Sequence, residues 1–80
     1  MYEDIKIAKS VDCLGLYCPA PVMRTREEID KLQIGDVMEM FADDPASEED
    51  IKAWAKRTEQ GLLGIEKTSE GFRFIIKKVK

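Results

Sequence analysis

Two cysteines, Cys13 and Cys18, are the side chains of this sequence best suited to chemistry. Cys18 directly precedes Pro19, and proline is favoured at the first position of a helix, where its missing N–H costs nothing. The sequence therefore predicts Cys18 at a helix N-cap. Unpaired N–H groups and the positive end of the helix dipole favour a thiolate there. We interpret Cys18 as a nucleophile, while noting that free cysteines are also common as small buried residues.

Cys13 admits two interpretations. It lies five residues before Cys18, which is not the C-x-x-C spacing of dithiol redox motifs. Cys13 could be a second, resolving thiol that forms a reversible disulfide with Cys18, or it could fill space at the end of a strand. We favour the second interpretation.

The residue types that are missing exclude several classes of site. The sequence contains 2 cysteines and no histidine, so it can form neither a serine–histidine nor a cysteine–histidine catalytic pair. A structural zinc site of cysteines and histidines takes four ligands, and the nucleotide-binding glycine motifs are absent. Asp43 and Asp44 are better explained by helix capping than as a catalytic or metal-binding pair. We therefore expect neither a metal nor a cofactor.

The segments around the second cysteine must position it. Apolar and polar residues alternate at first over Ile5–Val11, which is typical of a strand. Residues 12–17 then form a loop in which Gly15 can adopt a positive φ. A helix is predicted over about residues 19–32, with its φ angles fixed at the start by Pro19 and Pro21.

This first helix is predicted to be amphipathic. Its buried face comprises residues three or four apart, namely Val22, Thr25, Ile29 and Leu32. Its charged residues are predicted to face water: Arg24, Arg26, Glu27, Glu28 and Lys31. Glu27 and Lys31 have the spacing of a helical ion pair, and Gly35 follows as a helix stop.

A second helix is predicted after a mostly apolar strand at residues 37–42, which should lie centrally in a sheet. Asp44 can cap this helix with Pro45 at the first helical position, or a capping box can start at Ser47. Gly61 is predicted to close it. Its buried stripe comprises Ile51, Trp54, Ala55 and Thr58.

The remaining sequence predicts two strands, at residues 62–67 and 72–77, joined by a turn at 68–71. The element order is then βαβαββ within a single domain, residues 1–80. A right-handed crossover makes the first two strands parallel, and the last two form an antiparallel hairpin. The expected fold class is α+β: a two-layer α/β sandwich with a four-stranded mixed sheet and both helices on one face.

Composition restricts the partners. The 80 residues carry a formal net charge of −3 and are 44% hydrophobic, which favours a folded domain and argues against direct nucleic-acid binding. No signal-peptide pattern and no apolar run of membrane-spanning length is present. We expect a cytoplasmic protein without a membrane partner, in a compartment where thiols stay reduced.

The segment Asp12–Met23 resembles the Asp-x-x-Gly-Leu-x-Cys-Pro-x-Pro signature of TusA/SirA-like sulfur carrier proteins, and Ala42–Ala46 with Asp50 and Ile51 resembles the family's second motif. The resemblance implies a sulfurtransferase in which Cys18 holds sulfane sulfur as a persulfide. It also implies a supporting loop formed by Asp12, Gly15, Pro19 and Pro21.

The same resemblance implies two kinds of protein partner. The donor would be a cysteine desulfurase, a rhodanese or a DsrE-type protein. The acceptor would serve tRNA thiolation, molybdenum cofactor synthesis or the oxidation of sulfur compounds. We hypothesise that Arg24 and Arg26, at the cysteine end of the first helix, contribute to partner recognition.

Two positions depart from the family pattern and leave alternatives open. Cys13 occupies a variable position of the signature, and Gln60 stands where several members have a histidine. The main alternative function is a thiol–disulfide redox-regulatory module that uses Cys13 and Cys18. A third hypothesis is a non-catalytic interaction module whose loop binds a partner by shape.

Overall fold

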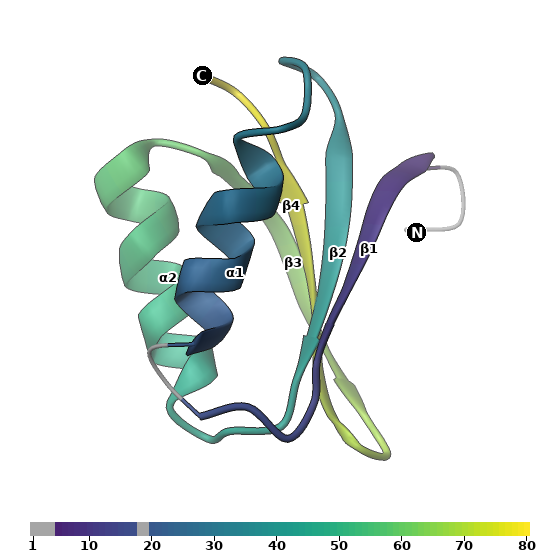
Figure 1. Ribbon diagram of the computed structural model, residues 1–80, viewed down its shortest axis with the longest axis vertical. Helices are drawn as coiled ribbons and strands as arrows, with labels where there is room; N and C mark the ends of the chain where they lie inside the picture. Colours follow the sequence, from purple (N-terminus) through teal and green to yellow (C-terminus); the bar gives the residue numbers. More distant parts are fainter. Residues whose placement is uncertain (1–4, 18–19) are drawn as a thin grey trace.

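The computed structural model describes residues 5–17 and 20–80, and its helices and strands follow the predicted order βαβαββ. The elements are β1 Ile7–Cys13, α1 Ala20–Ile29, β2 Val37–Ala42, α2 Ser47–Thr58, β3 Gly61–Thr68 and β4 Gly71–Lys77. The strands form one mixed sheet in the order β1-β2-β4-β3, and both helices cover the same face of it (Figure 1). The predicted two-layer α+β fold is therefore confirmed.

Strand β2 lies inside the sheet, as its apolar sequence predicts. It pairs in parallel with β1 and antiparallel with β4, while β3 and β4 form the antiparallel hairpin. Because β1 and β2 are parallel, their carboxyl ends meet at one edge of the sheet, and the first turns of α1 and α2 lie at that same end (Figure 1). We call this part of the molecule the loop end.

The core lies between the sheet and the helices. In α1, Thr25 and Ile29 are fully buried, and Val22 packs against the core at its edge, as does Leu32 just beyond the helix, so the predicted inner face is confirmed. The Thr25 hydroxyl donates a hydrogen bond to the Pro21 carbonyl, at 2.8 Å, which satisfies this buried polar group within the helix. The core also contains side chains from β1, β2, β4 and α2, mainly Val11, Met38, Met40, Ile51, Trp54, Ala55, Phe74 and Ile76, and Leu62 and Ile65 of β3 pack against it.

On the sheet face away from the helices, a charged group spans three strands. Arg73 on β4 forms hydrogen-bonded ion pairs with Glu39 on β2 and Glu66 on β3. Both carboxylates raise the pKa of the arginine above its ordinary value. This group joins the hairpin to the centre of the sheet.

The first strand and the first helix have different limits from those predicted. Strand β1 begins at Ile7 and continues to Cys13, because Asp12 and Cys13 pair with Phe41 and Ala42 of β2 instead of starting the loop. Helix α1 ends at Ile29, and the chain continues in tighter turns, in which the N–H of each of two residues reaches back three residues: Lys31 to Glu28 and Leu32 to Ile29.

Both predicted caps of the second helix are wrong. Helix α2 starts at Ser47, and its N-cap residue is Ala46, which has no side-chain cap. The Asp44 carboxylate instead accepts the Ala46 N–H at 3.0 Å and so closes the turn before the helix. The buried Ser47 hydroxyl has no hydrogen-bond partner among the residues that the structure describes. At the other end, Glu59 and not Gly61 terminates the helix, with a left-handed φ of 60°.

Candidate functional site

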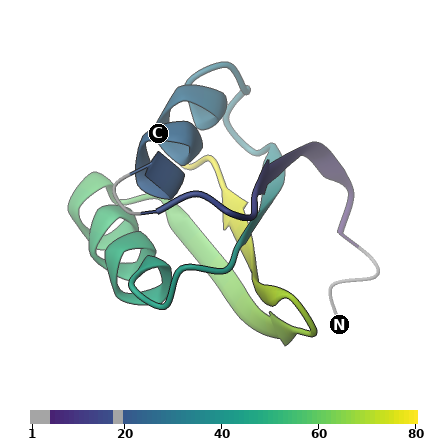
Figure 2. The ribbon, with the colours of Figure 1, turned by 60° about the horizontal axis from the view of Figure 1, so that its bottom comes forward.

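The loop between β1 and α1 is the predicted site, and its central residue, Cys18, lies outside the described residues together with Pro19. The described residues on both sides of this pair show how the loop is held. Figure 2 shows that the loop runs alongside the connection between β2 and α2.

On the strand side, the chain turns tightly at the end of β1. The Asp12 carboxylate accepts the Leu14 N–H at 2.9 Å, and the Leu16 N–H donates to the Cys13 carbonyl at 3.1 Å. Aspartate often stabilises a turn in this way, by bonding the backbone two residues ahead. Asp12 thus helps the chain to leave the sheet at a fixed angle.

Gly15 connects this turn to the neighbouring loop. Its φ of +82° lies in the left-handed region that glycine adopts most readily. Its N–H donates to the Asp43 carboxylate, at 3.0 Å, across 28 positions of the sequence. Sequence reasoning assigns Asp43 to helix capping and misses this contact. A signal for it exists, because Asp12 and Asp43 both lie at the carboxyl ends of neighbouring parallel strands, which share one edge of the sheet.

On the helix side, the Ala20 N–H donates a hydrogen bond to the Tyr17 carbonyl at 2.8 Å, which ties the start of α1 to the last described residue of the loop. Helix α1 starts at Ala20, which is two residues after the cysteine. Pro21 is buried in the first turn of this helix. The side chains just before the cysteine face solvent: Tyr17 is 80% exposed and Leu16 is 37% exposed.

Cys13 lacks the solvent exposure that a reactive thiol needs. It belongs to β1, not to the loop, and its exposed fraction is 0%. Burial raises the pKa of the Cys13 thiol above its ordinary value, and the positive charge of Arg24 offsets only part of that effect. A buried thiol with a raised pKa is a poor nucleophile.

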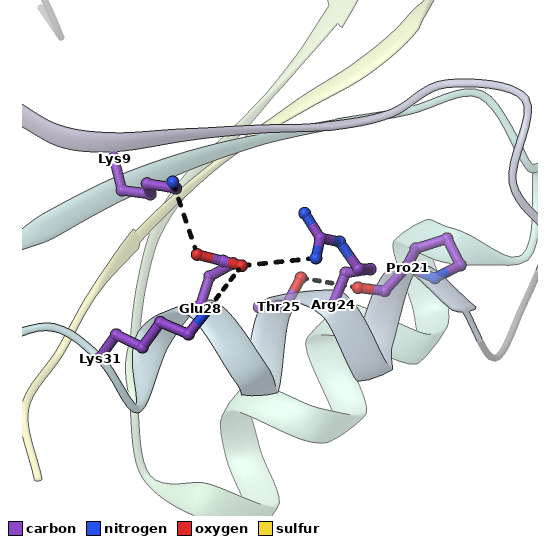
Figure 3. A network of polar contacts seen from close by, with 6 residues as sticks. All are labelled: Lys9, Pro21, Arg24, Thr25, Glu28 and Lys31. Atoms are coloured by element: carbon purple, nitrogen blue, oxygen red, sulfur yellow. Dashed lines mark hydrogen bonds and ion pairs between the residues drawn. The ribbon is translucent and has the colours of Figure 1, made fainter.

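The structure does not bring Arg24 and Arg26 together. Two residues on a helix that are two positions apart point about 200° away from each other. Arg24 forms an ion pair with Glu28, one turn further along α1, in which its Nη1 lies 3.4 Å from Glu28 Oε2 (Figure 3). Arg26 instead lines a shallow pocket of about 200 Å³ on the outer side of α1, together with Met23, Glu27 and Asp30.

Glu28 contradicts the prediction that it faces water. Its exposed fraction is 4%, and its carboxylate forms ion pairs with Lys9 of β1, with Arg24 of α1 and with Lys31 of the turn that follows α1 (Figure 3). Burial alone would raise the pKa of Glu28, but the hydrogen bond from Lys31 and the three cations lower it below its ordinary value overall. Lys31 therefore pairs with Glu28 and not with Glu27 as predicted. Glu28 joins α1 to β1, the two elements that flank the loop.

Gln60 lies at the end of the molecule opposite the loop end. Its side-chain oxygen accepts the N–H groups of Val79 and Lys80, at 2.7 and 3.2 Å, and its side-chain nitrogen donates to the Lys80 carbonyl. Lys78 similarly donates to the Leu32 carbonyl at 2.8 Å, at the end of the turns that follow α1. Gln60, one of the two residues that depart from the family pattern, therefore holds the C-terminal residues of the sequence in place and is not part of the loop end.

Within the described residues, neither helix is long and apolar enough to cross a membrane. Those residues also contain no group of three or more histidine, cysteine or carboxylate side chains arranged to bind a metal ion. The described part of the loop end thus consists of a loop held by hydrogen bonds at both flanks, exposed apolar side chains, and charged groups that lie apart from one another.

Comparison with known proteins connects this chain with sulfur transfer. The family model described as "Sulfurtransferase TusA" matches residues 9–78, which include both flanks of the loop. A protein of Archaeoglobus fulgidus named "Putative sulfur carrier protein" is 47% identical over 73 residues, which is 90% of this chain and 95% of that protein. A protein of Bacillus subtilis with the same description, YrkF, is 38% identical over 68 residues, which is 85% of this chain but only 37% of its own length.

A solved structure shows the same fold. The crystal structure of a SirA-like protein from Desulfitobacterium hafniense superimposes with a TM-score of 0.76, covering 90% of this chain and 99% of that chain at 22% sequence identity. The family match and the identity to the relative from Archaeoglobus fulgidus place the chain among sulfur carrier proteins. The chain belongs to the TusA family of sulfurtransferases.

Proposed function

We propose that Cys18 accepts sulfane sulfur as a persulfide and passes it to an acceptor protein, so that the chain acts as a sulfurtransferase in a relay. The observation that carries this proposal is the bracing of the loop. Before the cysteine, the Gly15 N–H is bonded to Asp43, and across it the Ala20 N–H is bonded to the Tyr17 carbonyl. A loop fixed at both flanks can present one side chain in a defined orientation.

The chemistry of sulfur transfer fits what the loop end contains. Transfer between thiolates needs no cofactor, and its rate depends on the thiolate fraction, the nucleophilicity and the access of the attacking sulfur. The exposure of Tyr17 and Leu16 supports access for a partner's active site. The start of α1 two residues later supports stabilisation of an anionic sulfur by the first-turn N–H groups.

The partners proposed are proteins on both sides of the relay. The donor is a cysteine desulfurase, a rhodanese or a DsrE-type protein, and the acceptor serves tRNA thiolation, molybdenum cofactor synthesis or the oxidation of sulfur compounds. The relay is proposed to operate in the cytoplasm.

The competing function, a dithiol redox module, receives less support. It requires Cys13 to react, yet this thiol is fully buried and burial raises its pKa. The two functions differ in their dependence on the two cysteines. A carrier is expected to lose sulfur loading in Cys18→Ala and to keep it in Cys13→Ala, whereas a dithiol module loses activity with either substitution.

Intact-mass measurement tests the proposal directly. The wild type, Cys18→Ala and Cys13→Ala proteins are incubated with cysteine and a cysteine desulfurase, or with tetrathionate. We expect an adduct that reductant removes, present in the wild type and in Cys13→Ala and absent from Cys18→Ala. The loss of two hydrogens without any adduct, from either donor, would instead establish the dithiol module.

A further inference from the structure

Helix α1 has charged residues on two of its sides, and only one of these sides has its charges paired. On the side that faces β1, the Glu28 carboxylate forms ion pairs with three cations (Figure 3). Lys31 has the spacing to pair with Glu27 but forms its ion pair with Glu28, at 3.4 Å. On the outer side, three exposed charged side chains have no ion pair with any residue that the structure describes: Arg26, Glu27 and Asp30.

These three charged side chains share a pocket with an apolar one. Together with Met23 they line the pocket of about 200 Å³ on the outer side of α1, and Met23 is 59% exposed. Pockets that bind cofactors or other small molecules typically measure about 300–1,000 Å³. This pocket is smaller, and its size suits one long side chain from another protein.

The charges around the pocket favour a cation. Glu27 and Asp30 are three positions apart, and side chains at this spacing are neighbours on a helix, with their Cβ atoms about 5–6 Å apart. One ammonium or guanidinium group can therefore contact both carboxylates. Arg26 lies about 100° around the helix axis from Glu27, so it borders the other edge of the pocket, where it can face an acidic group of the same partner.

We propose that this pocket receives a lysine or arginine side chain from a partner protein in the sulfur relay. The aliphatic part of that side chain packs on Met23, since long charged side chains readily cover apolar surface. Its cationic end contacts Glu27 and Asp30. The inference rests on the proposed function, because it specifies the chemistry of the partner with which sulfur is exchanged.

Other occupants match the pocket less well. A metal ion would make no use of the apolar Met23, and the guanidinium of Arg26 would repel it. A second copy of this chain would bring a further net charge of −3 toward the same carboxylates. A basic side chain of a partner matches both the apolar and the charged part of the pocket.

Binding of n-butylammonium, which reproduces the lysine side chain, tests the pocket without any sulfur donor. The amide signals of Met23, Glu27 and Asp30 are followed by NMR spectroscopy at constant ionic strength, in titrations with n-butylammonium and with butyrate. We expect shifts that saturate with n-butylammonium, with a dissociation constant of about 50 mM. Butyrate, which has the opposite charge, should produce no saturating shift.

A pair of double variants shows whether the two carboxylates hold the cation. Glu27→Gln/Asp30→Asn should lose the shifts. Glu49→Gln/Glu70→Gln is the matched control and should keep them, because it changes the net charge equally at exposed carboxylates of α2 and of the turn between β3 and β4. Equal binding of butyrate, or unchanged binding in Glu27→Gln/Asp30→Asn, would overturn the inference. Shifts that depend on protein concentration alone would place a second copy in the pocket and would also overturn it.

Single-turnover sulfur transfer from a cysteine desulfurase tests the consequence for docking. Glu27→Gln/Asp30→Asn should slow transfer about fivefold at low ionic strength, because the partner's cation loses its contacts, and Glu49→Gln/Glu70→Gln should not. The difference should disappear at about 0.5 M salt.

The direction of this change separates the alternatives. A partner without a basic group at the pocket would be repelled less by the less acidic variant, so transfer would be faster or unchanged, and the inference would fail. Equal slowing in both double variants would assign the effect to net charge and would contradict it as well. A wild type that takes up no sulfur would refute the proposed function, while the NMR titration would still decide whether the pocket binds a basic side chain.

Discussion

Gly71 begins β4 at a point where two segments of backbone almost touch. Its φ is +150°, and a Cβ atom built on it would lie 2.4 Å from the Ala42 carbonyl oxygen and 2.7 Å from the Asp43 Cα. Both obstacles are backbone atoms, so a side chain at this position must push the hairpin away from the end of β2. Asp43 also accepts the hydrogen bond from Gly15. A side chain added at Gly71 would therefore disturb the loop end as well as the sheet.

We predict that Gly71→Ala lowers the free energy of unfolding by about 3 kcal/mol, because steric overlap adds to backbone strain. Urea denaturation provides the measurement. Gly35→Ala is the matched control, since Gly35 also has a positive φ, of +99°, but a Cβ atom added there would meet nothing within 4 Å. Its loss should be about 1 kcal/mol, from backbone strain alone. Equal losses in the two variants would show that the close approach has no energetic cost.

The Ser47 hydroxyl has opposite expected effects on stability in the predicted cap and in the observed helix start. A capping serine stabilises a helix, so its replacement by alanine costs about 1 kcal/mol. The observed hydroxyl is buried with no partner among the described residues, and burying such a group is itself unfavourable. We therefore predict that Ser47→Ala raises the unfolding free energy by about 1 kcal/mol, measured by urea denaturation.

The control for this prediction removes a hydroxyl that does have a partner. Thr25→Val deletes the donor that bonds to the Pro21 carbonyl while preserving the shape of the side chain. It should lower the unfolding free energy by about 1 kcal/mol. A destabilised Ser47→Ala protein would mean that the hydroxyl caps the helix after all.

At the scale of elements, the periodicity of apolar residues is sufficient to predict the type and order of every helix and strand. The limits of the elements are less predictable, because they depend on pairing partners. Nothing local in the sequence shows that Asp12 and Cys13 continue β1, since their partners, Phe41 and Ala42, are supplied by β2. The predicted loop therefore begins two residues too early.

The other wrong or missed predictions at this scale involve charged residues. The helical pattern assigns Glu28 to the water-facing side of α1 because isolated carboxylates are rarely buried. Its burial depends on Lys9, which approaches from β1 and cannot be found from the helical pattern. The contact between Gly15 and Asp43 escapes prediction for the same reason: it joins two loops 28 positions apart.

The ion pairs of Glu28 predict that the stability of the fold depends on pH. The pKa of Glu28 is lowered by its contacts with Lys31, Lys9 and Arg24 despite its burial. A carboxyl group whose pKa is lower in the folded than in the unfolded protein contributes stability at pH values above its unfolded pKa, and this stability is lost as the pH falls through the folded pKa. Glu28→Gln should therefore be less stable than the wild type at neutral pH.

The difference between the two proteins should be constant above about pH 5.5. It should shrink as the pH falls below about 4.5, where Glu28 of the unfolded chain becomes protonated, and should continue to shrink until the pH passes the lower pKa of Glu28 in the folded protein. Urea denaturation at a series of pH values measures it. Glu27→Gln is the matched control, because this neighbouring carboxylate is exposed on the outer side of α1. A difference that does not change down to pH 3 would show that the charge of Glu28 is not what stabilises the protein.

At the scale of the whole molecule, the two ends of the sandwich contain different structural features. At the end opposite the loop end, hydrogen bonds of Gln60 and Lys78 hold the C-terminal residues against the rest of the fold. The loop end collects the starts of both helices and the turn that flanks the cysteine position (Figures 1 and 2). The sequence predicts the candidate site as a loop between the first strand and the first helix. The chemistry of Cys18 and the supporting roles of Pro19 and Pro21 stay predictions.

Charge around the loop end is expected to influence the rate at which a partner docks. The whole chain carries a net charge of −3, so an acidic partner is repelled overall and must be attracted locally. Arg24 is engaged by Glu28, whereas Arg26 is exposed on the outer side of α1 beside Met23, which is 59% exposed. Of the two arginines proposed for recognition, Arg26 can therefore be changed without disturbing the network that joins α1 to β1.

We predict that Arg26→Glu slows sulfur transfer to or from a partner protein about fivefold at low ionic strength, because local attraction becomes repulsion. The difference should largely disappear at about 0.5 M salt, where exposed charges are screened over a few ångströms. Single-turnover transfer, followed by intact mass, gives the rates. Lys56→Glu makes the same change in net charge in the last turn of α2, away from the loop end. If it slowed transfer as much as Arg26→Glu, the effect would come from net charge, and α1 would have no particular part in recognition.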